Sequence, residues 1–415
     1  MKFPQQGQPP AALLSSLKAR KSNDVRWEDG RVFAYIYDAG EEAKQLLKDA
    51  FSLYLMENGL DPTSFPSCLE LEKDVIGMAV DLVNGGADAT GTFTSGGTEA
   101  DVHAVTGGIP TRADRVVCSA VEHPAVLATV TALGGSTVAV HRDGRIDLDA
   151  LAAELSLPGK VGLVSVMAAN NEIGTLNDLA EVAAVVAEHA PGAALHTDAV
   201  QAAAWLDLRR VATPAALVSV SAHKFGGPRG VGALVVRSGT PLRALLPGGG
   251  QELGRRSGTT HVAGIVGMAA ALSALDRERD EVVRRVSGLR DRLESELGGV
   301  PGVVPTVASS TPRLAGTAHL LIDDVDSEPL LFLLDDAGVR ASAGSACASG
   351  AAAASHVLAA IGADAASDGR RRGALRLTLG HDATDGQVDR AVEVIAATVE
   401  RLRAPVRRLT PDREG

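Results

Sequence analysis

The chain has 415 residues, more than one ordinary domain needs, which favours a large domain joined to a smaller one. Its formal net charge of -11 argues against nucleic acid or an anionic membrane as the main partner. Three cysteines, an odd and sparse set, do not suit a secreted disulfide framework. The first residues lack a signal-peptide apolar run, and no apolar stretch reaches the ~20 residues of a membrane-spanning helix. We therefore expect a cytoplasmic protein that binds neither nucleic acid nor membrane.

Hydrophobic residues make up 45% of the chain but aromatic residues only 3%, so the core must consist mainly of alanine, valine and leucine. Residues 1–30 are polar and contain prolines, and amphipathic helices are predicted over 41–57 and 70–84. From 90 to 240, short apolar runs alternate with alanine-rich helical stretches. This alternation is typical of a mostly parallel sheet covered by helices.

The last third of the chain has a different pattern. A charged helix is predicted over roughly 274–297, where it leads out of the large domain. Residues 303–400 mix strand-like pieces with helices, which suits a smaller α/β domain. The stretch GSACASGAAAAS at 344–355 is rich in alanine and glycine and could form a mobile loop running into a helix.

A glycine-rich motif, Ser95-Gly96-Gly97-Thr98-Glu99, follows the run TGTFT. Small residues let the backbone approach an anion, and a following helix would direct its N–H groups at that anion. Thr98 can add a hydroxyl donor. An ordinary glycine turn remains the alternative for this motif taken alone.

Asp198 ends the apolar run AALHTD, and Lys224 follows the run ALVSV 26 residues later, with one intervening strand. In an α/β sheet the carboxyl ends of the strands border the ligand crevice. A carboxylate there can keep a pyridinium nitrogen protonated, and a lysine amine can form a Schiff base. Taken singly, Asp198 could be a helix N-cap and Lys224 a solvated loop residue. Together they predict pyridoxal 5′-phosphate (PLP) bound covalently to Lys224.

Two further polar groups follow predicted strands. Glu122-His123-Pro124 comes after RVVCSAV, and Asn170-Asn171-Glu172 comes after KVGLVSVMA. An imidazole at a strand end could stack on an aromatic cofactor or shuttle protons, although a single histidine is more often structural. The asparagines add amide donors at another strand end.

Seven motifs between about residue 90 and residue 400 carry a family resemblance in matching order and spacing. They are TSGGTEA, EHPAV, NNEIGT, HTDAVQAA, SAHKFGGPRGVGAL, GGGQELGRRSGT and GSACASG. The chain resembles the cysteine desulfurases, which are class V aminotransferase-like enzymes of PLP fold type I. The resemblance implies an α/β transferase fold with an N-terminal segment and helix (1–60), a large PLP-binding domain with a mostly parallel sheet (61–272) and a small C-terminal α/β domain (273–415).

The resemblance also implies roles in cofactor binding. Lys224 would bind PLP and later move protons, Asp198 would pair with the pyridine nitrogen, and His123 would stack on the ring and take part in catalysis. The remaining implied contacts are Gln201 and Asn171 beside the ring hydroxyl, Gly97, Thr98, Ser221 and His223 at the phosphate, and Thr259 reaching in from the other subunit. A homodimer is therefore implied.

The implied substrate is L-cysteine. Arg376 in ALRLTLG resembles the arginine that grips the substrate carboxylate, a task that suits a bidentate guanidinium, and Asn171 would also contact the substrate. Cys347 resembles the nucleophile that takes the sulfur as a persulfide and leaves L-alanine; by composition alone it would be a small apolar residue. Cys68 and Cys118 are interpreted as structural. The sequence does not name the protein or small molecule that accepts the sulfur.

The first ninety residues depart from the desulfurase pattern. The segments WEDGRVFAYIYDAG and NGLDPTSFPSCLELEKDVIGMAVDLVNGGADA resemble sphingosine-phosphate lyases and related group II decarboxylases. One alternative is therefore a PLP-dependent lyase or decarboxylase, including a selenocysteine lyase, that acts on another amino acid. A third possibility is a catalytically silent PLP fold that serves as a binding partner, against which Lys224, Asp198 and Arg376 together argue.

Overall fold

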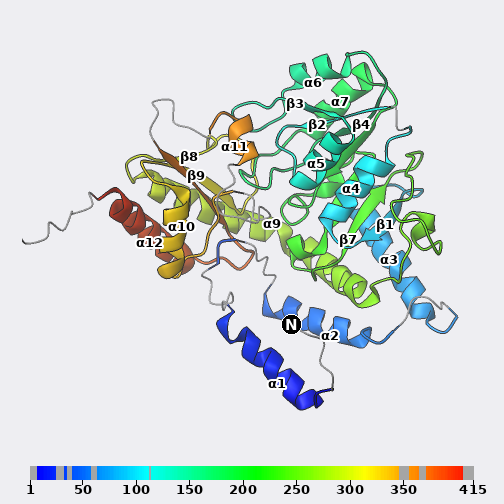
Figure 1. Cartoon of the computed structure of the whole chain (residues 1–415), viewed down its shortest axis with the longest axis horizontal. Helices are drawn as coiled ribbons and strands as arrows, with labels where there is room; N and C mark the ends of the chain where they lie inside the picture. The colour runs from blue at the N-terminus through cyan, green and yellow to red at the C-terminus, as the bar shows by residue number, and fades with distance from the viewer. Residues whose placement is uncertain are drawn as a thin grey trace, which may run out of the picture.

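The computed structural model describes residues 7–24, 32–34, 40–57, 63–111, 114–344, 355–363 and 371–404. Two sheets organise these residues, one with seven strands and one with three. In Figure 1 the larger sheet and the helices that cover it lie to the right, and the smaller sheet lies to the left with α10 and α12.

The large sheet is mostly parallel, as the sequence predicts. Its strands follow the order β1-β7-β6-β5-β4-β2-β3. Only β7 runs antiparallel to its neighbours, β1 and β6, while the other adjacent pairs are parallel. The strands are β1 (Thr90–Thr94), β2 (Arg115–Ser119), β3 (Ser136–Val138), β4 (Val161–Ser165), β5 (Ala194–Asp198), β6 (Leu217–Ser221) and β7 (Gly232–Val236).

Side-chain alternation along these strands divides the core between the two faces of the sheet. Leu217 and Leu234 pack with α4 and α5 on one face, whereas their neighbours Val218 and Val235 pack in the main cluster on the other. Helix α4 contacts β1, β5, β6 and β7, and α3 contacts β1 and β7. The helices of this part are α3 (Pro66–Leu82), α4 (Gly97–Gly107), α5 (Pro124–Ala132), α6 (Leu148–Leu155), α7 (Leu179–His189) and α8 (Leu208–Val211).

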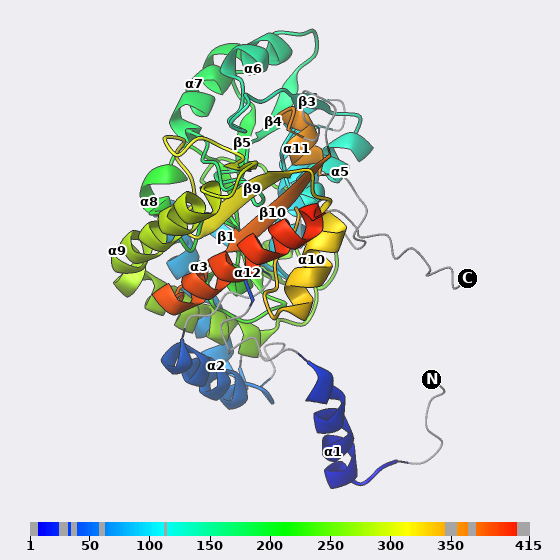
Figure 2. The same cartoon turned by 90° about the vertical axis from the view of Figure 1, so that its left-hand side faces the viewer.

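The small sheet is antiparallel, in the order β10-β9-β8. Helices α10 and α12 cross one face of it, in front of β9 and β10 in Figure 2. Thr384 and Gln387 form a reciprocal capping box that begins α12. The elements are β8 (Val303–Pro305), β9 (Thr317–Asp323), β10 (Arg372–Thr378), α10 (Ser327–Asp336), α11 (His356–Ala360) and α12 (Asp385–Arg403).

The helix predicted to leave the large domain is longer than expected. Helix α9 (Val262–Gly298) has 37 residues and begins well before residue 274. The first part of the helix is apolar and buried. It therefore lacks the charged face from which the later part was predicted. The helix packs against α2 and α3 and, further along, against β8, β9 and α12. The expected boundary between 272 and 273 therefore falls inside one continuous helix.

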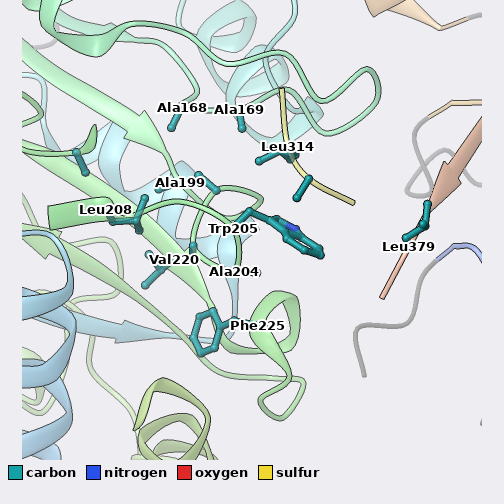
Figure 3. Close-up of a cluster of buried hydrophobic side chains, with 14 of the residues drawn as sticks. Ala168, Ala169, Ala199, Ala204, Trp205, Leu208, Val220, Phe225, Leu314 and Leu379 are labelled. Atoms are coloured by element: carbon teal, nitrogen blue, oxygen red, sulfur yellow. The ribbon is translucent and has the colours of Figure 1, made fainter. Parts of the chain in front are cut away.

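Trp205 lies between the two sheets. Figure 3 shows its ring beyond Ala199 and Ala204, which follow β5, with Leu314 above the ring and Leu379 on its far side. The ring meets His381 edge-on, with centroids 4.9 Å apart. A Cβ added at Gly316 would lie 2.7 Å from the indole, so only glycine fits there. The surrounding residues are mostly alanine, valine and leucine, as the low aromatic content predicts.

The N-terminal part contains more helix than expected. Helix α1 (Pro10–Arg20) lies within the segment interpreted as polar, and α2 (Glu41–Leu53) ends four residues earlier than predicted. Helix α3 begins at Pro66 rather than at 70, because proline suits the first helical turn. In the part of the chain that the structure describes, no helix combines the length and the apolarity needed to cross a bilayer.

Candidate active site

The polar residues singled out from the sequence lie at one edge of the large sheet. Strands β2, β4, β5 and β6 run in the same direction, and β1 shares that direction because β7 is antiparallel to both β1 and β6. The residues that follow their carboxyl ends therefore lie along one edge of the sheet, the edge that borders the ligand crevice in open α/β folds. These residues come from the segments after Thr94, Ser119, Ser165, Asp198 and Ser221.

The start of α4 forms an anion-binding cradle. Gly96 has φ of 141°, and a Cβ added at Gly97 would lie 2.7 Å from a methyl group of Val200, so both positions require glycine. The space beside Gly96 leads to Ser221, whose Oγ would be 3.6 Å from an added Cβ. Thr98 lies exposed in the first turn. The N–H groups of this turn can thus bind a phosphate together with neighbouring hydroxyls.

His223 adds a neutral donor to the cradle. Its Nδ1 lies 2.9 Å from Ser221 Oγ. Burial, together with the charges of Lys224 and Arg229, lowers the pKa of His223 to about 4. If the serine hydroxyl donates to Nδ1, the proton of the neutral ring is on Nε2, where it can be donated to a phosphate oxygen.

Asp198 and Lys224 approach each other from neighbouring strands, β5 and β6. Asp198 is 6% exposed, and its Oδ1 accepts a hydrogen bond of 2.8 Å from the Val200 N–H. Burial raises the pKa of Asp198 above its usual range, and His123, the Val200 N–H and Lys224 limit that rise. The alternative of a helix N-cap does not apply, because a turn rather than a helix follows Asp198, and one carboxylate oxygen holds that turn. The same carboxyl also faces the crevice groups His123 and Lys224.

His123 caps α5, where its Nδ1 accepts a hydrogen bond of 3.1 Å from the Ala125 N–H. Because Nδ1 is an acceptor, the neutral ring carries its proton on Nε2. Gln201 is half-buried in the turn that follows Asp198. Both side chains therefore lie on the segments that border the crevice.

Arg376 reaches the crevice from the small sheet. It is 5% exposed on β10, and its Nη1 donates a hydrogen bond of 3.0 Å to the backbone oxygen of Asn171. Two atoms here are buried without a hydrogen-bond partner in the described structure, Arg376 Nε and Asn171 Oδ1. Buried polar atoms of this kind are costly unless a ligand satisfies them. The arrangement suits a carboxylate at Arg376 and a polar ligand group at Asn171.

Cys347 lies outside the described residues, but the chain on either side of it is placed. The buried Glu172 accepts a hydrogen bond of 2.6 Å from Ser355 Oγ at its Oε2. A Cβ added at Gly344 would lie 3.2 Å from the same oxygen. Both Gly344 and Ser355 therefore lie at Glu172, directly after Asn171 in the chain.

The other predicted residues are placed as follows. Thr259 is exposed on its own chain and lines a cavity of 100 Å³ that also includes Thr94 and Ser95. Cys68 and Cys118 are fully buried free thiols, and burial raises the pKa of each. Buried, protonated thiols are unreactive, which agrees with the structural interpretation of both.

Comparison with known proteins identifies the family. Residues 79–391 match the aminotransferase class-V family. An IscS-like cysteine desulfurase of Mycobacterium tuberculosis is 44% identical over 324 residues, which cover 75% of this chain and 81% of that protein. The chain belongs to the cysteine desulfurases of the class-V aminotransferase family. A cysteine desulfurase of Cereibacter sphaeroides is 42% identical over 341 residues, covering 78% of this desulfurase and 84% of that one.

Solved structures agree with this assignment. A NifS-like protein superposes with a TM-score of 0.77 at 27% identity and covers 89% of this desulfurase and 99% of its own chain. A sphingosine-1-phosphate lyase of Burkholderia pseudomallei has a TM-score of 0.77 at 20% identity, covering 97% and 93%. The latter likeness is one of fold, and its coverage agrees with the lyase-like front predicted from the sequence. Enzymes of this family depend on PLP, and the donor set along the crevice fits that cofactor.

Two buried carboxyls of the site were assigned no role from the sequence, although one of them, Glu172, stands in the segment Asn170-Asn171-Glu172 named there. Asp101 is 1% exposed and Glu172 is 0% exposed. A signal for Asp101 was present, because it lies four residues after Gly97 and therefore on the same helical face. An acidic residue on the otherwise apolar, sheet-facing side of a helix indicates a buried polar contact.

Proposed function

We propose that this cysteine desulfurase binds PLP covalently on Lys224, converts L-cysteine to L-alanine and takes the sulfur onto Cys347 as a persulfide. The observation that carries the proposal is the convergence of Asp198 and Lys224 from adjacent strand ends, with the start of α4 on one side and Arg376 on the other. When bound, PLP supplies an electron sink for bonds at the substrate α-carbon.

The chain's own groups would hold the cofactor by charge and shape. The first turn of α4, Ser221 and His223 bind the phosphate, and Asp198 keeps the ring nitrogen protonated. His123 packs on the ring, while Gln201 and Asn171 flank its hydroxyl. This division of contacts follows the crevice from the cradle to the small sheet.

The substrate would be oriented by its carboxylate on Arg376, and Asn171 contacts the same ligand. The Lys224 amine would move the α-proton of the bound substrate. The thiolate of Cys347 then attacks the substrate sulfur. A sulfur–sulfur bond forms, the carbon–sulfur bond breaks, and its electron pair stays on carbon, which takes a proton to become the methyl group of alanine.

A direct assay tests the proposed function. Purified protein is incubated with L-cysteine and a thiol reductant, and sulfide and alanine are quantified. The desulfurase reaction releases them in equal amounts. Carbon dioxide with an amine, or turnover restricted to another amino acid such as selenocysteine, would contradict the proposal and favour the lyase or decarboxylase alternative.

Replacement of Arg376 by alanine is expected to raise KM for cysteine at least ~100-fold, because a desolvated carboxylate loses its charge partner. PLP absorbance should stay at the wild-type level, since Arg376 contacts substrate rather than cofactor. The matched control is Arg372→Ala on the same strand, whose guanidinium instead pairs with Asp323 at 2.8 Å. Unchanged cysteine affinity in the Arg376 variant would count decisively against this role.

We expect a homodimer in which Thr259 serves the site of the partner subunit. Light scattering should give twice the 42.5 kDa of the chain. The inactive variants Lys224→Ala and Thr259→Trp should regain activity when unfolded and refolded together. About a quarter of wild-type activity is expected, because half of randomly formed dimers are mixed and each has one intact site. A fully active monomer, or no recovery on mixing, would refute the shared site.

The persulfide sulfur would pass to an acceptor protein or small molecule in the cytoplasm. A reducing compartment suits this chemistry, because it keeps the nucleophilic thiol free between turnovers.

A further inference from the structure

A layer of buried polar side chains lies behind Asp198, between α4 and the centre of the large sheet. Asp101 from α4, Glu122 from the turn after β2 and His196 from β5 are 1%, 0% and 0% exposed. The reaction proposed above uses none of them. Because this region is closed to solvent, every uncompensated charge in it is costly.

The hydrogen bonds of this layer define the state of its imidazole. His196 Nδ1 lies 2.8 Å from Ser165 Oγ, and its Nε2 lies 3.0 Å from Ser219 Oγ. Burial lowers the pKa of His196 to about 3, so the ring is neutral. Asp101 Oδ1 lies 3.7 Å from His196 Nε2, which is too long for a hydrogen bond. His196 therefore supplies no positive charge to Asp101.

The remaining surroundings of Asp101 are acidic or uncharged. Helix α4 packs against β1, β5, β6, β7 and α5, and the carboxyls that face Asp101 are those of Asp198 and Glu122. The Ser219 hydroxyl bonds to Asp101, while Asp101 Oδ1 has no partner in the described structure. Burial raises the pKa of Asp101 well above its usual range, and the two carboxyls raise it further. Burial also raises the pKa of Glu122 to about 8.

Asp198 has different neighbours on its crevice side. Burial raises the pKa of Asp198 as well, but His123 and Lys224 both favour its ionised form and the Val200 N–H donates to it. Two carboxyls in one low-dielectric layer do not both ionise when cations face only one of them. The geometry therefore separates the pair into a charged member beside the crevice and a neutral member behind it.

We propose that Asp101 carries a proton at neutral pH and is a positioning residue that leaves Asp198 as the carboxylate of this layer. A charged Asp101 would repel the charge on Asp198 and drive a proton onto it, and the ring nitrogen would then lose its anionic partner. The location of the proton is a property of the chain, whereas its consequence for PLP rests on the proposed function.

The first test is the pH dependence of thermal unfolding of the full-length, PLP-saturated protein. In the unfolded chain Asp101 has its ordinary pKa of ~3.9, so unfolding above that pH releases its proton. A folded-state pKa above the unfolded value makes wild-type stability fall as pH rises. Asp101→Asn is neutral in both states and lacks this loss. The Tm of the variant minus that of wild type should therefore increase by on the order of 5 °C between about pH 5 and about pH 8.

The control is Asp149→Asn, an exposed acid on α6, for which the Tm difference should not change with pH. A constant or decreasing difference for Asp101→Asn would overturn the proposal, because Asp101 would then be ionised, as in an ion pair with His196. The variant should also keep the PLP spectrum and bind PLP within about threefold of wild type, since no charge next to Asp198 changes.

Infrared spectroscopy of protein with ¹³C-labelled aspartate carboxyls provides a test that needs no variant. The wild type should show the carbonyl band of one protonated aspartic acid at neutral pH. This band should persist in Asp198→Asn and disappear in Asp101→Asn. Absence of the band in wild type, or its loss in Asp198→Asn, would overturn the proposal. The result is independent of turnover, so failure of the desulfurase assay would not be mistaken for failure here.

Discussion

Replacing Lys224 by alanine is expected to remove covalent PLP and to lower turnover on the order of a thousandfold or more. The wild-type protein should be yellow, and borohydride should fix the cofactor to the peptide that contains Lys224. The phosphate cradle at α4 is untouched by this change, so the variant should still bind PLP noncovalently. Absorbance spectra, borohydride reduction and peptide mass spectrometry measure these three outcomes.

A suitable control is Lys160→Ala, which removes an exposed lysine at 3.7 Å from Asp114 and far from the motif around Lys224 in the chain. Its spectrum and turnover should match wild type. Reductive fixation of PLP on any lysine other than Lys224 would show that the assignment is wrong.

Replacing Cys347 by serine should separate cofactor chemistry from sulfur transfer. The variant should bind PLP and cysteine normally, since Lys224, Asp198 and Arg376 are intact. It should not release alanine at a useful rate, because a serine hydroxyl is a far weaker nucleophile than a thiolate towards sulfur. Mass spectrometry of cysteine-treated wild type should show one added sulfur on the peptide that contains Cys347.

The control variant is Cys68→Ala, in which a fully buried thiol is removed and turnover should persist. Sulfur found on Cys68 or Cys118 would contradict the assignment. Full alanine production by the serine variant would do the same, and the lyase alternative would then be favoured.

The strand-end residues could be predicted because local patterns determine them. Short apolar runs followed by polar residues predicted that Asp198 and Lys224 end neighbouring segments of a parallel sheet, and β5 and β6 are indeed adjacent. The glycines before α4 were predictable for the same reason, since a close backbone approach leaves few residue choices. Both features depend on residues near one another in the chain.

The parts that could not be predicted depend on packing between distant segments. Arg376 meets Asn171 only because the small sheet docks beside the large one, and no local pattern encodes that docking. The family resemblance implied that Arg376 binds the substrate carboxylate, but it did not predict the contact between Arg376 and Asn171. The start of α9 was misplaced because a buried apolar helix has no polar face to set its period. The surroundings of Asp101 could not be predicted, because His196 and Ser219 lie on strands about a hundred residues away in the chain.

Helix α9 limits how this protein can be divided or recombined. Its 37 residues span ~55 Å, with Ile265 and Met268 buried near one end and Leu293 and Leu297 near the other. A fragment cut between 272 and 273 would divide the helix unequally and leave each piece with an uncovered apolar surface. A protease that cleaves exposed linkers would find none in 262–298. A chimera with a lyase could exchange the N-terminal part, but it could not exchange one sheet without breaking α9. One continuous helix therefore links the two sheets, and they cannot be separated at 272/273 without breaking it.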